Sequence, residues 1–238
     1  MNDVELIAIM PVFNEEAGIA RVITGWLEAL SRERITYLLV AINDGSTDAS
    51  LAILNQLQLR FPTQLIVLTK INSGHGQTCR FGYEFAVSHG AQWVLQIDSD
   101  GQCDPAFLAE FMAKRYQADC IFGVRVSRDD GFSRRFISMV CRLLIAIFTG
   151  QRLRDPNVPY RLIECSALAA ALRTVPKEID LQNIALAVAL KRNGERRWAY
   201  VPIRFRAPIH AQVRMTLPKI VRMGFRMLAQ IHNVKNVS

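Results

Sequence analysis

The chain has 238 residues, half of which are hydrophobic, and it carries a formal net charge of +8 at pH 7. This length and composition are typical of one large domain, alone or with an appendage, and they exclude a disordered protein. The five cysteines are scattered and form no CxxC pair, which argues against a disulfide framework or a zinc site and fits a reducing compartment.

The N-terminal half of the chain alternates apolar runs with stretches of helical character. Strands are expected at residues 6–10, 37–42, 65–69 and 93–97, and a helix is expected after each of them. Asn14 would cap the first helix, and the fourth would open at Asp104 with Pro105 in its first position. Strands separated by helices of this length predict a parallel sheet that is covered by helices on both faces.

Polar, glycine-bearing clusters follow each of the four predicted strands. They contain Phe13, Asp44, Gly74 and Asp98 respectively. Because ligands of such sheets bind beyond the carboxyl ends of the strands, we expect these four residues to line one rim. His75, next to Gly74, would either touch a phosphate there or serve as an ordinary turn residue.

Two carboxylates follow the fourth predicted strand at spacing i, i+2. In extended backbone, alternate side chains share a face, so Asp98 and Asp100 would converge on one hard cation, with the Gln102 carbonyl as a third oxygen. Mg²⁺ or Mn²⁺ holding a diphosphate would suit these ligands. The plainer interpretation is a solvated turn in which Asp104 caps the next helix.

Three segments, in this order, resemble family 2 glycosyltransferases with the GT-A fold. They are Pro11-Val12-Phe13-Asn14-Glu15-Glu16, Asn43-Asp44-Gly45-Ser46-Thr47-Asp48 and the DxD motif Asp98-Ser99-Asp100. The segment from Asp98 to Pro105 is most similar to polyprenyl-phosphate hexose transferases of the dolichyl-phosphate mannose synthase type. The resemblance implies an α/β GT-A domain over residues 1–205, with a mixed, mainly parallel, Rossmann-like sheet and helices on both faces. A basic amphipathic C-terminal extension would follow at residues 206–238.

The resemblance also implies roles for individual residues. The nucleotide-diphosphate sugar donor would be bound by Pro11, Phe13, Glu15, Ile42, Asp44, Asp98, Ser99 and Asp100. Asp98, Asp100 and Gln102 would hold the Mg²⁺ or Mn²⁺ ion that bridges the diphosphate. The catalytic set would be completed around Asp100 by Arg125 and Arg134, as additional clamps on the diphosphate. Arg206 would join this set on the acceptor side.

The acceptor distinguishes branches of this family. A sugar hydroxyl needs a positioned general base, whereas a phosphate monoester is already largely anionic and needs cations to position it. Asn183 stands about where a family carboxylate is expected, although Glu178 and Asp180 lie nearby, and arginines follow at Arg204, Arg206 and Arg214. This balance favours transfer of a hexose to a polyprenyl phosphate, with inversion implied by the resemblance. Transfer to a saccharide hydroxyl in cell-surface polysaccharide synthesis is the alternative.

The C-terminal part of the chain is strongly basic, with eleven Lys or Arg from residue 191 onward against one acid, Glu195. Segments 132–149 and 217–231 pattern as basic amphipathic helices, which suit an anionic membrane surface, a sheet-covering helix or an oligomer contact. With neither a secretory signal nor a membrane-spanning run, we expect a cytoplasmic protein, peripheral to the inner face of the cytoplasmic membrane. A homo-oligomer or a separate membrane-anchoring partner would also fit.

Two other functional classes share some of these features. A Rossmann-type oxidoreductase or methyltransferase would have the alternating strands, but the loop after the first strand lacks GxGxxG. A basic nucleic-acid-binding protein would explain the charged C-terminal part, but no aromatic-basic motif of a known reader is present, and no nucleic-acid partner is expected.

Overall fold

The computed structural model describes residues 4–127, 146, 150, 153–178, 182–192 and 196–206, and every structural statement below concerns these residues. Arg134, Asp180 and Arg214 lie outside them. So do nearly all of the predicted helix at 132–149, the predicted helix at 217–231 and the predicted extension beyond residue 206.

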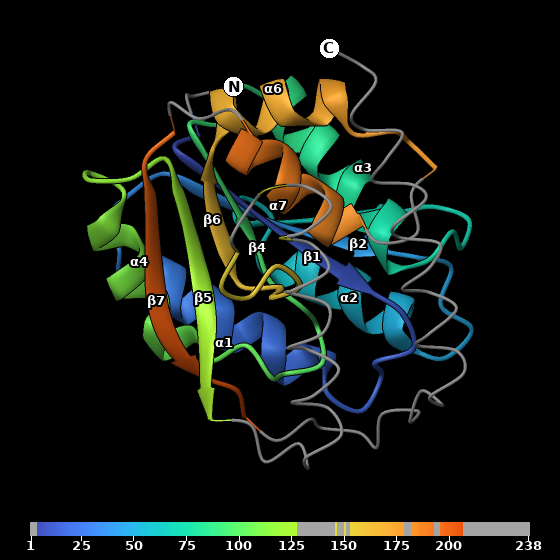
Figure 1. Cartoon of the computed structure of the whole chain (residues 1–238). Helices are drawn as coiled ribbons and strands as arrows, with labels where there is room; N and C mark the ends of the chain where they lie inside the picture. Colours follow the sequence, from blue (N-terminus) through green and yellow to red (C-terminus); the bar gives the residue numbers. More distant parts are fainter. Residues whose placement is uncertain are drawn as a thin grey trace.

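The described strands form one mixed sheet in the order β3-β2-β1-β4-β6-β5-β7 (Figure 1). Their bounds are β1 (Leu6–Val12), β2 (Tyr37–Asn43), β3 (Leu65–Thr69), β4 (Trp93–Gln96), β5 (Cys120–Ser127), β6 (Arg161–Glu164) and β7 (Trp198–Arg204). β1 pairs in parallel with β2 and β4, and β2 pairs in parallel with β3. β6 is antiparallel to both β4 and β5, while β5 and β7 are parallel. The mixed, mainly parallel sheet is therefore as predicted.

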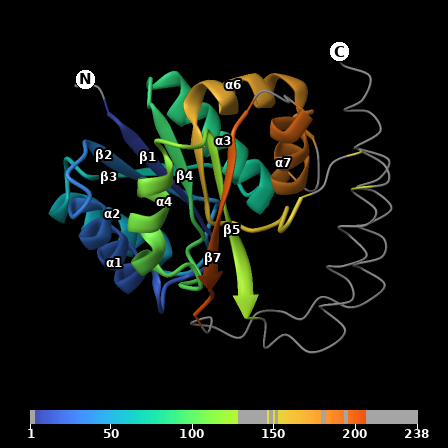
Figure 2. The same cartoon turned by 60° about the vertical axis from the view of Figure 1, so that its left-hand side comes forward.

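Helices cover both faces of the sheet (Figure 2). α1 (Ile19–Ser31), α2 (Ser50–Arg60) and α4 (Leu108–Lys114), which follows the 3₁₀ turn η1 (Pro105–Phe107), lie on one face. α3 (His75–Ser88), α6 (Cys165–Thr174) and α7 (Gln182–Arg192) lie on the other. In the part of the chain that is described, no helix is both long and apolar enough to cross a bilayer.

The hydrophobic pattern explains why these elements pack as they do. All seven residues of β1 are buried, as befits a central parallel strand that is covered on both faces. α1 buries one stripe at helical spacing, which includes Val22, Trp26 and Leu30. On the other face, α3 approaches closely at Gly82, where a Cβ would lie only 2.6 Å from the Ile42 Cδ1 atom. The close contact of α3 with β1 and β2 sets where its N-terminus meets the strand ends.

One of the two predicted helix caps is wrong. α1 begins at Ile19, with Gly18 at its N-cap and no side-chain cap, so Asn14 does not cap it. Asn14 instead adopts a left-handed backbone conformation, with φ of 54°, and bonds to a neighbouring loop. The cap at Asp104 is confirmed, because its side chain accepts a hydrogen bond from the Ala106 amide, although the first turn is 3₁₀ rather than α-helical.

Candidate active site

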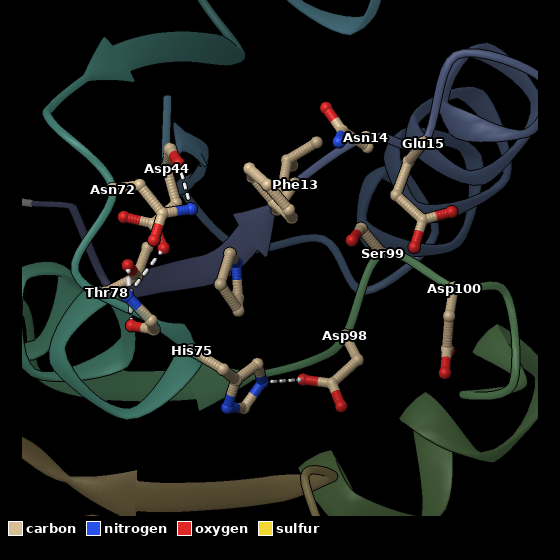
Figure 3. Close-up of a pocket in the computed structure, with 13 residues that line it drawn as sticks. Phe13, Asn14, Glu15, Asp44, Asn72, His75, Thr78, Asp98, Ser99 and Asp100 are labelled. Atoms are coloured by element: carbon tan, nitrogen blue, oxygen red, sulfur yellow. Dashed lines mark hydrogen bonds and ion pairs between the residues drawn. The ribbon is translucent and has the colours of Figure 1, made fainter. Parts of the chain in front are cut away.

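A cavity of about 580 Å³ opens at the carboxyl ends of β1, β2 and β4, beside the N-terminus of α3 (Figure 3). It is lined by Pro11, Val12, Phe13, Asn14, Glu15, Asp44, Asn72, Gly74, His75, Thr78, Asp98, Ser99 and Asp100. The four residues that were expected to share one rim all lie in this lining. This is the position at which parallel α/β sheets bind ligands.

The loop after β1 is tied to the loop after β2 by hydrogen bonds that run in both directions. The Asn14 Oδ1 atom accepts from the Thr47 amide at 2.8 Å, and the Asn14 amide donates to the Ser46 hydroxyl at 3.1 Å. The Glu16 carboxylate accepts from the Ala49 amide at 2.8 Å, next to the start of α2. Because the bonds involve main-chain groups of both loops, the backbone on either side of Asn14 is held in one conformation.

Asp44 is almost completely buried and organises the loop before α3. Its carboxylate pairs with the Lys70 ammonium at 2.5 Å and accepts hydrogen bonds from the Ser73 and Gly74 amides, each at 3.0 Å. Burial alone would raise the pKa of Asp44, but the hydrogen bonds from Lys70 and Ser73 lower it below its usual value. Asp44 is therefore ionised, and it fixes the path of residues 70–74.

The two aspartates of the DxD motif have different partners. The Asp98 Oδ1 atom lies 2.9 Å from the His75 Nε2 atom, whereas the Asp100 Oδ1 atom accepts from the Gln102 amide at 2.9 Å. Contact with Cys79 and the negative charge of Asp98 raise the pKa of His75 well above its usual value. Both carboxylates point the same way from the loop that carries them (Figure 3).

The lining of the cavity is strongly acidic. It contains Glu15, Asp44, Asp98 and Asp100, and its single basic side chain is His75, since none of the described lining residues is Lys or Arg. In the described ranges, no three His, Cys, Asp or Glu side chains come close enough together to hold a metal ion. Carboxylates are ligands that Mg²⁺ and Mn²⁺ prefer, so the lining suits a divalent cation that is shared with an anionic ligand.

Several predicted site residues lie elsewhere. Ile42 is fully buried in β2 against α3 and does not line the cavity. Gln102 is also absent from the lining, and its backbone is used instead, with the amide bonded to Asp100 and the carbonyl accepting from the Arg206 amide at 3.0 Å.

Two of the predicted catalytic arginines are engaged in ion pairs. Arg125 forms a bidentate pair with Asp155, at 2.8 and 2.7 Å, and its guanidinium lies 5.4 Å from the centre of the Phe205 ring. Arg206 pairs with Asp104 at 2.7 Å. Neither arginine lines the cavity. The immediate partner of Arg125 is therefore Asp155 rather than the predicted diphosphate, and that of Arg206 is Asp104 rather than an acceptor phosphate.

The candidates for a general base also lie away from the cavity. Asn183 is buried in the first turn of α7, and its carbonyl accepts a hydrogen bond at 3.0 Å from Arg161, which is itself completely buried. Glu178 is exposed, and neither it nor Asn183 is part of the lining.

Among the lining residues, Asn72 and Thr78 had no predicted site role, and the partner of His75 was not predicted. Asn72, whose side chain donates to the Asp44 carbonyl at 2.9 Å, and Thr78 both line the cavity. His75 was left open between phosphate contact and turn residue, whereas in the structure it contacts Asp98. The polar character of residues 70–78, between a strand and a helix, was the available signal for all three.

Comparisons with known proteins agree with this architecture. The family model described as "Glycosyl transferase family 2" matches residues 7–173. The chain is 24% identical over 221 residues to undecaprenyl-phosphate 4-deoxy-4-formamido-L-arabinose transferase of Edwardsiella ictaluri, a match that covers 92% of this chain and 66% of that protein. It is 26% identical over 171 residues to dodecaprenyl-phosphate galacturonate synthase of Rhizobium johnstonii, covering 71% of this chain and 50% of that protein. The chain thus spans about half to two thirds of the length of these relatives.

Among solved structures, the fold is similar to that of glucosyl-3-phosphoglycerate synthase from Mycobacterium tuberculosis, crystallised with Mn²⁺, UDP and glucosyl-3-phosphoglycerate. The TM-score is 0.68 at 15% sequence identity, and the match covers the whole of this chain and 81% of that one. At this level of identity the likeness concerns the fold, and it confirms the GT-A architecture that was predicted from the motifs.

Proposed function

The chain belongs to glycosyl transferase family 2, and we propose that it transfers a hexose from a UDP- or GDP-sugar to a polyprenyl phosphate with inversion. The observation that carries the proposal is the cavity at the ends of β1, β2 and β4, whose lining contains both carboxylates of the DxD motif. A divalent cation held by these two carboxylates would bind the diphosphate of a nucleotide there. Membership of this family also argues against the oxidoreductase, methyltransferase and nucleic-acid-binding alternatives.

The donor set fits Mg²⁺ or Mn²⁺ shared with a substrate. These ions are commonly bound through one or two carboxylates together with substrate phosphates, rather than by an all-protein cage. Asp98 and Asp100 would supply the two carboxylates, whereas Gln102 lies outside the lining of the cavity. When bound, the ion would neutralise the charge that develops on the departing nucleoside diphosphate. The Mn²⁺ and UDP in the M. tuberculosis synthase support this choice.

The nucleoside would occupy the β1 and β2 side of the cavity. Phe13 lines it with 47% of its surface exposed and offers a ring face for the base, beside Pro11 and Glu15. Asp44 would contribute mainly through the loop that it holds, because its carboxylate already accepts from Lys70 and two backbone amides. These residues would orient the donor so that its diphosphate lies over Asp98, Ser99 and Asp100.

The polyprenyl phosphate acceptor is supported by the relatives and by the chemistry of the site. Both named relatives act, by their names, on undecaprenyl or dodecaprenyl phosphate. None of the base candidates that the structure describes faces the cavity, and an anionic phosphate monoester requires no base. We further propose that the enzyme meets this lipid at the cytoplasmic face of the membrane through its basic C-terminal residues.

The test is a screen of Mn²⁺-dependent hydrolysis and transfer over UDP- and GDP-sugars, with and without a short polyprenyl phosphate. Saccharide acceptors that offer only hydroxyl groups belong in the same screen. We expect slow hydrolysis of one donor and faster transfer to the lipid phosphate, both abolished by EDTA. Transfer to hydroxyl acceptors alone, or activity that is indifferent to metal, would contradict the proposal.

A further inference from the structure

A line of polar contacts runs from the core to the DxD motif. The Tyr83 hydroxyl donates to the Gln96 Oε1 atom, and the Gln96 Nε2 atom lies 3.4 Å from the Cys79 sulfur. The same sulfur lies 3.7 Å from the His75 Nδ1 atom, and the His75 Nε2 atom lies 2.9 Å from the Asp98 Oδ1 atom. Tyr83, Gln96 and Cys79 are buried. The contacts therefore begin in the core, where side chains are held by packing, and end at the cavity.

The chemistry of the last contact sets the orientation of Asp98. A carboxylate accepts hydrogen bonds, so the His75 Nε2 atom must carry a proton, and it does so in one neutral tautomer as well as in the charged ring. The bond therefore does not depend on the charge of the imidazole. Because Oδ1 is engaged, the second carboxylate oxygen of Asp98 is the one available to a cation, and it points away from His75 (Figure 3).

His75 is itself fixed from a second direction. It is the first residue of α3, and the preceding residue, Gly74, has φ of 86° and donates its amide to Asp44 at 3.0 Å. The acid at the end of β2 and the acid at the end of β4 thus belong to one hydrogen-bonded unit, with His75 between them. Partners of this kind hold metal ligands in position in other proteins, and removing them typically costs about 10- to 100-fold in metal affinity or activity.

We propose that His75 is a positioning residue that holds the Asp98 carboxylate in the orientation needed to bind a divalent cation together with a nucleoside diphosphate. This inference rests on the proposed function, because it requires the diphosphate to be bound through such an ion. In this role His75 affects metal binding through Asp98 and does not contact the nucleotide.

The experiment compares His75→Leu, which removes the donor, with His75→Gln, which keeps one. His89→Leu is the matched control, because His89 caps the opposite end of the same helix and is exposed. Binding of UDP and of GDP is measured by calorimetry over a series of Mn²⁺ concentrations. Thermal melting of each variant tests whether the fold is kept.

We expect the Mn²⁺ concentration that gives half-maximal nucleotide binding to be at least about 10-fold higher for His75→Leu than for the wild-type protein. Saturating Mn²⁺ should restore the wild-type nucleotide affinity, since only the metal ligand is misplaced. His75→Gln should lie within about threefold of the wild-type protein, because its side-chain amide can donate to Asp98, and His89→Leu should behave as wild type.

Two results would overturn the inference. An unchanged Mn²⁺ requirement in His75→Leu would mean that Asp98 is oriented without it. A loss of nucleotide affinity that persists at saturating Mn²⁺ would mean that His75 contacts the nucleotide directly. If the wild-type protein bound neither nucleotide in a Mn²⁺-dependent manner, the proposed function would be contradicted rather than the role of His75. The titration of the wild-type protein alone shows this. Should His75→Leu melt early, the His75→Gln titration and the Mn²⁺ dependence of its activity decide the question.

Discussion

The two sides of the sheet hold their polar residues in different ways. On the β1, β2 and β4 side, the carboxylates and amides of Asn14, Glu16 and Asp44 bond to backbone amides of neighbouring loops. On the β5, β6 and β7 side, Arg125 and Arg206 pair instead with other charged side chains. These bonds fix the loops around the cavity on the first side, the cradle side, whereas an anion on the second side would have to compete with acids already in place.

The largest expected effect is on the cradle side. Asp100→Asn should lower transfer and hydrolysis by roughly 100-fold or more, because a bound cation supplies several kcal/mol of transition-state stabilisation. The melting temperature should change little, since Asp100 lies at the cavity rather than in the core. Asp119→Asn, directly before the start of β5 and outside the cavity lining, is the control and should keep full activity. Equal activity of the two variants would mean that Asp100 does not bind a metal ion that the reaction needs.

On the other side, the next largest effect is expected at Arg161. This side chain is completely buried and donates to the carbonyls of Val158 and Asn183. Arg161→Met would remove these hydrogen bonds from a charged donor and should lower the free energy of unfolding by about 3 kcal/mol, since such bonds contribute about 1.5–3 kcal/mol each. Urea denaturation measures the change, with the exposed Arg60→Met as the control. A change below about 0.5 kcal/mol would show that water replaces the guanidinium.

The Arg125 and Asp155 pair tests whether ion pairs define the second side. Both side chains are mostly buried and the contact is bidentate, so a double-mutant cycle of Arg125→Met and Asp155→Asn should give a coupling of about 1–2 kcal/mol in unfolding free energy. Affinity for the donor nucleotide should stay the same in both single variants. A loss of that affinity in Arg125→Met, with no coupling, would return Arg125 to the predicted role of diphosphate clamp.

The smallest expected effect concerns acid stability on the cradle side. Because the pKa of Asp44 is lower in the folded protein than its usual value of 3.8, its contribution to stability is complete above that value. The contribution is lost as the pH falls through the lowered value. The wild-type protein should therefore be more stable than Asp44→Asn by about 1 kcal/mol at neutral pH, which is the net contribution of about one hydrogen bond. This difference should vanish in acid. A difference that is constant from pH 7 to pH 2 would contradict this account of Asp44.

The same contrast explains how much could be predicted from sequence. The four N-terminal strands and their shared rim were predictable, because apolar runs that end in polar loops are local signals; residues 65–69 match β3 without change. Asp98 and Asp100 were predictable as a pair because their spacing is local as well. The Asn14 prediction was wrong because the loop after β2 competes for its side chain, and nothing near Asn14 in the sequence signals that contact.

On the second side, the decisive partners are distant in sequence. Arg125 meets Asp155 and Arg206 meets Asp104, across 30 and 102 positions respectively. β6 runs antiparallel between β4 and β5, so the neighbours along the sheet do not follow chain order. An arginine in such a region has the same appearance in sequence whether it faces a ligand or an internal carboxylate. Its role therefore depends on the tertiary structure.

The most direct test of the account is a crystal structure of the protein with Mn²⁺ and a nucleotide sugar, with the ion located by its anomalous signal. We predict one Mn²⁺ ion bridging the diphosphate to the carboxylates of Asp98 and Asp100, with the base beside Phe13. A nucleotide bound outside this cavity, or a diphosphate held there with no ion at either carboxylate, would contradict the account.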